Sequence, residues 1–210
     1  MTIERGTVAL LTRRREKLAQ GAEPIGWKIG FNVPAIQEKL AIDAPLAGYL
    51  TSDGLLVDGT TWPLSDEGDV VVESEVAVEL GDDARSIVAL MPALELADPP
   101  DLSQDVETIL AGNIFHRGVA FGPRVLTDTP GAARILVNGE LQHEILAQET
   151  GARLEEMVEV VAKRLADAGQ KLEPAQRIIT GVLAPPHAAQ PGDVVRLEID
   201  RLGGVELRFS

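Results

Sequence analysis

Apolar and polar residues alternate with two different spacings along this chain, one typical of helices and one typical of strands. Apolar positions that recur every three to four residues predict helices, and they do so at 3–20, 34–40, 102–111 and 154–165. Short runs that are rich in Val or Ile, or that alternate in character, predict strands. Such runs lie at 25–30, 69–80, 86–91, 118–122, 177–180, 193–200 and 205–209.

Turn-forming residues separate these elements. Asn138-Gly139 lies between two predicted strands at 133–137 and 140–145, a pattern that favours a hairpin with a type I′ turn. Residues 45–53 are predicted to be rich in turns, and Gly203-Gly204 is predicted to join the last two strands.

The order of the elements indicates an α+β fold built on a mixed sheet. A few isolated helices interrupt a strand-rich pattern, without the regular strand–helix alternation of a doubly wound sheet. The break Asp98-Pro99-Pro100-Asp101 is predicted to cap the helix at 102–111. The sequence contains no internal repeat, no Walker sequence and no Gly-x-Gly-x-x-Gly turn. We therefore expect one domain with a full core.

The amino-acid composition argues against several classes of binding partner and excludes several kinds of site. The net charge of -14 and an aromatic content of 3% argue against binding to nucleic acid or to anionic membranes. The absence of cysteine excludes disulfides, thiolate zinc sites and cysteine nucleophiles, and it fits a cytoplasmic protein. No apolar run approaches the ~20 residues of a membrane span. The run from Val8 to Leu11 is too short for a signal peptide.

Two carboxylates provide the first candidate chemistry. Glu73 and Glu75 stand at i and i+2 of the predicted strand 69–80, so both project from one face. Carboxylates this close repel one another unless a cation lies between them, and Mg²⁺ or Mn²⁺ suits oxygen ligands. A solvent-facing strand edge is the alternative, because Glu79 shares the same face.

Several short segments extend this observation along the chain. They are Gly26-Trp27-Lys28-Ile29-Gly30-Phe31, Val72-Glu73-Ser74-Glu75-Val76-Ala77, Pro92-Ala93-Leu94-Glu95-Leu96, Val137-Asn138-Gly139-Glu140, Ile179–Pro185 and Gln190-Pro191-Gly192-Asp193. In this order they resemble the fumarylacetoacetate hydrolase superfamily, within it the 2-keto-4-pentenoate hydratase/4-oxalocrotonate decarboxylase branch. The resemblance implies a fold like that family's C-terminal domain, a mixed, curved sheet forming a β-sandwich roll with a few flanking helices. It also implies an N-terminal helical segment at 1–22, a catalytic domain at 23–210 and a homo-oligomer.

The resemblance implies a metal-dependent lyase. Glu73, Glu75 and Glu95 match the residues that bind Mg²⁺ or Mn²⁺ in that family. A small 2-oxo or 2-hydroxydienoic acid would chelate the ion, and hydration or decarboxylation would pass through a metal-stabilised enolate. Two alternatives remain open, a C–C hydrolase of acylpyruvates and a non-catalytic paralogue that serves as a binding or partner subunit. A partner enzyme in aromatic catabolism is also expected.

The remaining site residues follow from the same resemblance. Lys28 matches the active-site lysine of the branch and is expected to bind substrate and stabilise the enolate; an ordinary lysine on a strand surface is the alternative. Asn113, Thr180 and Gly181 are expected to contact substrate.

The chain departs from the branch at several positions. Leu46 stands where the branch has an acid, and residues 98–100 and 112–116 differ. His116 lies in the second altered segment and is a candidate general base, since an unperturbed pKa of about 6.5 suits that role. His187 is a candidate for lining the pocket, and His143 is expected to be structural or exposed.

Overall fold

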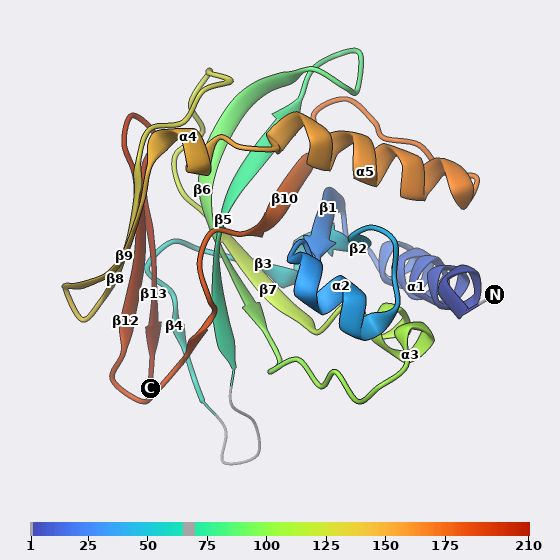
Figure 1. The fold of residues 1–210 in the computed structure, drawn as a ribbon, viewed down its shortest axis with the longest axis horizontal. Coiled ribbons are helices and arrows are strands. Elements are labelled where there is room, and N and C mark those ends of the chain that lie inside the picture. Colours follow the sequence, from blue (N-terminus) through green and yellow to red (C-terminus); the bar gives the residue numbers. More distant parts are fainter. Residues whose placement is uncertain (1, 65–69) are drawn as a thin grey trace.

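Two β-sheets and several helices make up the described part of the protein, residues 2–64 and 70–210 of a computed structural model. Within these residues the strands form one sheet of eight and one of five. Figure 1 shows the five-stranded sheet on the left, the eight-stranded sheet in the centre and helices α1, α2 and α3 on the right. The predicted α+β class with a mixed, curved sheet is confirmed.

The helices are short apart from the first and the last. They are α1 (Thr2–Ala19), α2 (Pro34–Leu40), α3 (Val106–Ala111), α4 (Ala147–Thr150) and α5 (Leu154–Asp167), with one 3₁₀ turn at Ser52–Gly54. Helix α1 packs on α3, and its Leu10 and Leu11 join the core. The division at residue 22 stays a prediction. None of the described helices combines the length and the apolarity that crossing a membrane requires.

The strands follow the predicted order with four additions. They are β1 (Pro24–Gly30), β2 (Leu46–Thr51), β3 (Leu55–Leu56), β4 (Thr61–Trp62), β5 (Val71–Leu80), β6 (Ile87–Ala97), β7 (His116–Phe121), β8 (Ala133–Val137), β9 (Glu140–Ile145), β10 (Arg177–Val182), β11 (His187–Ala188), β12 (Val194–Ile199) and β13 (Gly203–Phe209). The additions are β2, β3, β4 and β11. The larger sheet runs β2-β1-β10-β5-β6-β7-β3, with β11 beside β5. The smaller runs β4-β13-β12-β8-β9. Residue 69, at the start of the predicted strand 69–80, lies outside the described residues.

Local sequence signals predicted two elements well. Strands β8 and β9 form the expected hairpin, and Asn138 and Gly139 have φ angles of 54° and 81°, as a type I′ turn requires. Helix α5 buries the predicted face, which includes Met157 and Val161. Because these signals lie within a few residues of one another, the sequence alone specifies them.

Four predictions of local structure were wrong. Residues 46–51 form β2, a strand buried along its whole length between β1 and the helices, although Pro45 and Gly48 suggested turns. Strand β6 continues through Pro92, which lies opposite Val76 of β5. Helix α3 begins after Asp105, whose carboxylate accepts a hydrogen bond from the Thr108 N–H, so Asp101 is not its cap. The β12–β13 turn lies at 200–202, before Gly203-Gly204.

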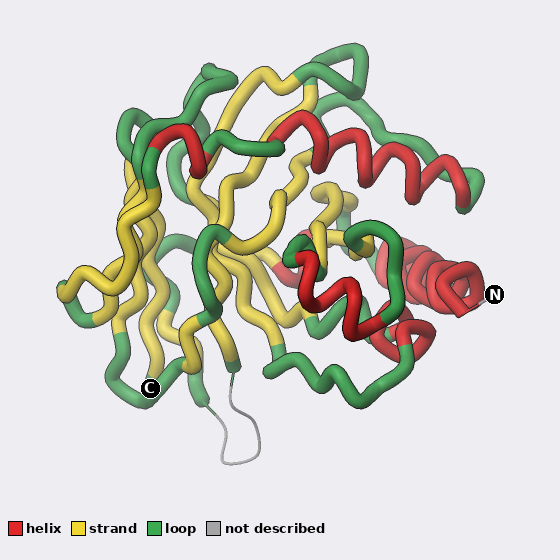
Figure 2. The backbone as a smooth tube through the Cα atoms, viewed as in Figure 1, coloured by secondary structure: helices red, strands yellow, loops and turns green. Residues whose placement is uncertain are grey.

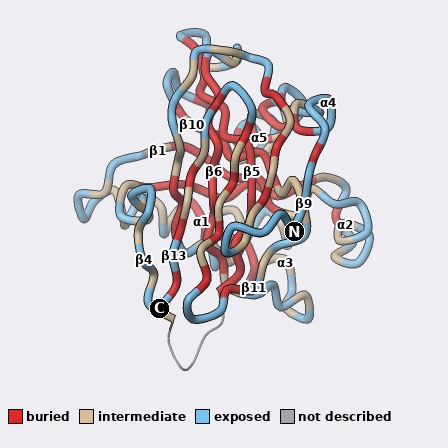
Figure 3. The backbone as a smooth tube through the Cα atoms, turned by 90° about the vertical axis from the view of Figure 1, so that its left-hand side faces the viewer, coloured by how far each residue is buried: buried red, intermediate tan, exposed pale blue. Residues whose placement is uncertain are grey.

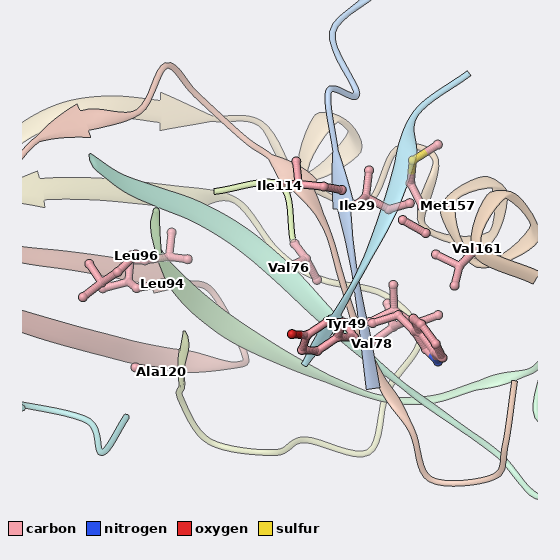
Figure 4. Close-up of a cluster of buried hydrophobic side chains, with 14 of the residues drawn as sticks. Ile29, Tyr49, Val76, Val78, Leu94, Leu96, Ile114, Ala120, Met157 and Val161 are labelled. Atoms are coloured by element: carbon pink, nitrogen blue, oxygen red, sulfur yellow. The ribbon is translucent and has the colours of Figure 1, made fainter. Parts of the chain in front are cut away.

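The core lies between the two sheets and beneath α5. Figure 3 shows buried backbone concentrated along β5, β6 and β10, and Val76 and Val78 have no exposed surface. In Figure 4, Met157 and Val161 of α5 lie near Ile29 of β1. Strands covered on both faces read as nearly continuous apolar runs. A carboxylate within such a strand therefore stands in a desolvated environment.

Candidate metal centre and adjoining cavity

Three carboxylates from two neighbouring strands meet inside the larger sheet. Glu73 and Glu75 project from one face of β5, and Glu95 on β6 pairs directly with Glu73 in the strand register. Ligand oxygens from all three lie within 4.8 Å of one another. Glu75 and Glu95 have no exposed surface, and Glu73 is less buried. The structure thus brings together the three glutamates that the sequence singled out.

The pKa values of these groups reflect burial and mutual repulsion. Burial, with the nearby charge of Glu95, raises the pKa of Glu73 to about 7. Burial and the charges of Glu95 and Glu73 raise the pKa of Glu75 well above its ordinary value. Glu75 Oε1 and Glu95 Oε2 are buried, and no described residue offers either a hydrogen bond. Buried carboxylate oxygens without partners fit a hard divalent cation, which prefers oxygen ligands.

Lys28 enters this cluster from β1. Its side chain is buried, pairs with Glu95 Oε1 and donates a hydrogen bond of 3.1 Å to the Ile114 carbonyl. Burial is the largest influence and lowers the pKa of Lys28, but the charges of Glu95 and of the other two glutamates and the hydrogen bond to Glu95 together outweigh it, so the net pKa is raised. The alternative of a lysine on a strand surface is therefore wrong. A Cβ at Gly48 would lie 2.8 Å from Lys28 Cγ, so glycine leaves the space that this side chain occupies.

His116 contacts the cluster from the start of β7. Its Nδ1 lies 2.8 Å from Glu95 Oε1, while Nε2 is buried beside Gly54 without a described partner. The ring lines a separate pocket with Tyr49 and Arg117, and it is not among the described residues around the cavity next to Glu73. A general base must reach the substrate. The geometry therefore favours a positioning role for His116, in which it orients Glu95.

A strained turn precedes His116. Asn113, Ile114 and Phe115 have φ angles of 57°, 53° and 63°, a run of left-handed conformations that costs roughly 1–3 kcal/mol per residue. The Asn113 side chain supports the turn, because its Oδ1 accepts from the Tyr49 N–H and its Nδ2 donates to the Tyr49 carbonyl. Both ends of the amide are thereby committed to β2. Asn113 thus anchors the turn, and its predicted contact with substrate stays a prediction.

Thr180 and Gly181 lie on β10 beside the carboxylate cluster. Thr180 Oγ1 donates to the Val76 carbonyl at 2.9 Å, and the Gly181 N–H donates to Glu75 Oε2 at 2.6 Å. Gly181 has a φ of 97°, and a Cβ there would lie 2.5 Å from the side chain of Asn32. These contacts orient Glu75. The predicted contact of either residue with substrate stays a prediction.

A cavity of about 170 Å³ opens beside Glu73 and Lys28. Most of its wall is apolar, including Phe31, Ile36 of α2 and Leu102. Figure 2 shows the loop that carries Leu102, between β6 and α3, running below α2. Sequence reasoning missed these residues. Phe31 closes a segment that had been singled out, but Ile36 and Leu102 carry no chemical signal of their own.

The other positions that were flagged lie away from the cavity. Leu46 is a buried core residue of β2, so no acid stands at that place. The His187 Nε2 lies 2.8 Å from Asp193 Oδ2, and this histidine is not among the described residues that line the cavity. His143 is exposed on β9, as expected.

Known proteins resemble this chain along most of its length, although no protein-family model matches it. It is 28% identical over 220 residues to a 2-keto-4-pentenoate hydratase of Paraburkholderia xenovorans, an alignment that covers 95% of this chain and 80% of the relative. A 4-oxalocrotonate decarboxylase from Pseudomonas putida G7, solved with magnesium and adipate, superposes with a TM-score of 0.83. That match has 22% identity and covers 96% of this chain and 83% of the decarboxylase.

A more distant solved structure has the same fold. A fumarylpyruvate hydrolase from Pseudomonas aeruginosa, in complex with Mn²⁺ and pyruvate, is 15% identical and superposes with a TM-score of 0.65 over 88% of each chain. Together with the sequence similarity along nearly the whole chain, these matches support the predicted resemblance to the fumarylacetoacetate hydrolase superfamily, in the branch of the 2-keto-4-pentenoate hydratases and 4-oxalocrotonate decarboxylases.

Proposed function

We propose that the protein is a divalent-metal-dependent lyase, a hydratase or decarboxylase, that acts on a small 2-oxo or 2-hydroxydienoic acid. The convergence of Glu73, Glu75 and Glu95 beside a buried Lys28 is the observation that carries this proposal. The names of the relatives, and the Mg²⁺ and Mn²⁺ in the related structures, support it. The proposed ion is Mg²⁺ or Mn²⁺.

The three glutamates would hold the ion, and three carboxylates leave open positions on an octahedral cation. When bound, such an ion draws electrons from the carbonyl of a chelated 2-oxo acid. The chain must keep the ligands fixed while this happens. The Gly181 N–H holds Glu75, and His116 holds Glu95, so two of the three ligands are oriented by groups outside the cavity.

Lys28 supplies a positive charge at the same place. Its ammonium lies between Glu95 and the cavity, close to where an oxygen of the substrate would gain negative charge. A preorganised cation in a buried site stabilises such a charge more than it would in water. We assign Lys28 the binding of substrate charge and the stabilisation of the enolate. The apolar wall of the cavity excludes water from this step.

Calorimetry and a substrate screen test the proposal together. Mn²⁺ should bind the native protein at one strong site. Mn²⁺-loaded protein should then convert at least one 2-oxo or 2-hydroxydienoic acid, followed by enol absorbance and by product mass. If metal binds but no acid of either class, nor any acylpyruvate, is converted, the non-catalytic alternative replaces this proposal. Cleavage of acylpyruvates alone would identify a C–C hydrolase.

A further inference from the structure

The cavity beside Glu73 has an apolar wall that the protein itself leaves partly uncovered. Phe31, Ile36, Leu102 and Phe115 line it, and each is only half-buried. They come from the segment after β1, from α2, from the loop before α3 and from the turn before β7. Apolar side chains that gather around a cavity and stay partly exposed are typical of a surface that a ligand covers.

The backbone holds two of these rings in place under strain. Phe31 and Phe115 have φ angles of 61° and 63°, in the left-handed region that non-glycine residues rarely occupy. Such conformations persist where the surrounding structure demands them, and they gather at ligand sites. Both strained phenylalanines line the same cavity. The surrounding fold therefore holds the apolar wall of this cavity in a defined position.

The charges of the lining residues leave no cation for the far end of a ligand. Among the described residues that line the cavity, Lys28, Glu73 and Asp98 carry charge. Lys28 is committed to Glu95. Asp98 pairs with Arg117, whose Nε lies 2.8 Å from Asp98 Oδ1, and Arg117 itself lines a different pocket. A second carboxylate on the ligand would thus meet apolar side chains and a negative charge.

We propose that this cavity selects 2-oxo acids whose far end is uncharged and apolar, and that Asp98 discriminates against a second carboxylate. The inference rests on the proposed function, because the metal centre must hold the oxo acid group. A divalent ion and Lys28 together balance the charges of Glu73, Glu75 and Glu95. A monoanionic ligand therefore adds one negative charge to a balanced centre, whereas a dianion also places charge on a wall where the described lining residues offer it no free cation.

Three ligands of graded structure test this selection by calorimetry on Mn²⁺-loaded native protein. Pyruvate provides the head group alone, 2-oxohexanoate adds an apolar tail, and 2-oxoadipate carries a carboxylate on a chain of equal length. Burial of one methylene improves affinity about threefold to fourfold. We expect 2-oxohexanoate to bind at least about tenfold more tightly than pyruvate, and about tenfold more tightly than 2-oxoadipate.

Two variants assign the effect to residues. Asp98→Asn should improve 2-oxoadipate binding about threefold at low salt and leave 2-oxohexanoate within about twofold, since a half-exposed charge is screened. Ile36→Ser, on a helix without fully buried residues, should weaken 2-oxohexanoate about threefold and leave pyruvate unchanged. Asp82→Asn removes the same charge at an exposed position in the β5–β6 turn and should change neither affinity.

The outcomes separate this inference from the function on which it rests. If no oxo acid binds in a metal-dependent way, pyruvate included, the proposed function fails. If pyruvate binds but 2-oxoadipate binds as tightly as 2-oxohexanoate, the selection is overturned while the function stands. If native discrimination is present but Asp98→Asn binds 2-oxoadipate no better than Asp82→Asn does, the role of Asp98 is overturned.

Discussion

Glu75 and Glu79 stand on the same face of β5, four residues apart, yet their surroundings are opposite. Glu79 accepts hydrogen bonds from Arg124 at 2.5 and 2.9 Å and lies 3.7 Å from Arg177 Nε, and these cations hold its pKa below the ordinary value. Glu75 is fully buried beside Glu73 and Glu95, and burial with their charges raises its pKa. Arginines balance the charge of Glu79 at one end of the strand. At the other end, Glu75 lies among like charges that the described residues do not balance in this way.

The difference shows how a structural carboxylate is told from a functional one. The sequence pattern treats Glu73, Glu75 and Glu79 alike, because all three share one face of a strand. The arginines that complete Glu79 come from the loop after β7 and from β10, so only the tertiary structure reveals them. A buried group without such a partner calls for an explanation, and the proposed divalent cation would supply one at Glu75.

The largest expected difference is in Mn²⁺ affinity, between variants that remove one carboxylate from each end of β5. Glu75→Gln should weaken Mn²⁺ binding by at least about a hundredfold, because an anionic ligand is lost while the Gly181 contact can be kept. Glu79→Gln should leave Mn²⁺ affinity within about twofold of native. Calorimetric titration measures both. Equal affinities in the two variants would show that the glutamate cluster is not the metal site.

Lys28, the lysine that the described part of the chain places against Glu95, provides the next test. Lys28→Met in Mn²⁺-loaded protein should keep metal affinity near or above native, because a positive neighbour of the ion is removed. Turnover of an identified oxo acid should fall about a hundredfold, as is usual when a group aimed at a developing oxyanion is lost. Lys17→Met removes an exposed lysine that pairs with Asp53 and serves as the control. Turnover of Lys28→Met within about twofold of that control would leave Lys28 without a chemical role.

The raised pKa of Glu73 predicts how Mn²⁺ affinity at the glutamate cluster depends on pH. With a pKa of about 7, Glu73 must release a proton to bind metal, so Mn²⁺ affinity should fall about tenfold from pH 8 to pH 6. In metal-free protein, the free energy of unfolding changes with pH in the opposite direction to the Mn²⁺ affinity. A folded-state pKa above the unfolded value stabilises the fold at low pH, and this contribution is lost as pH rises through about 7.

Calorimetry at a series of pH values, beside thermal melts of metal-free protein, measures both effects. Glu73→Gln provides the control, because it carries no proton to exchange in this range. A native Mn²⁺ affinity that stays constant between pH 6 and pH 8 would contradict the raised pKa.

The smallest expected effect is on the free energy of unfolding, and it has opposite signs for substitutions at Glu79 and Glu75. Without metal, Glu79→Gln should lower the free energy of unfolding by about 1 kcal/mol, since a hydrogen-bonded ion pair with Arg124 is weakened. Glu75→Gln should raise that free energy, because a buried charge beside like charges is removed. Urea unfolding at neutral pH compares the two variants. Destabilisation by both would mean that Glu75 is already satisfied without a cation.

The sequence determined the parts of this protein that depend on neighbouring residues. The hairpin at Asn138-Gly139, the buried face of α5 and the shared face of Glu73 and Glu75 each follow from spacing within one element. The ordered segments that resemble a family added Glu95, which lies on another strand. Homo-oligomerisation, a cytoplasmic location and a partner enzyme remain predictions from the sequence.

The tertiary structure decided which polar groups find partners. Lys28 is 67 residues from Glu95 in sequence and pairs with it, and His116 reaches the same carboxylate from β7. Residues 46–51 form a buried strand instead of turns because β1 offers hydrogen bonds along their length. Contacts of this kind depend on which strands lie side by side and on how water is excluded between them. No local periodicity encodes either, so one strand face carries the candidate metal ligands Glu73 and Glu75 and, four residues on, the ion-paired Glu79.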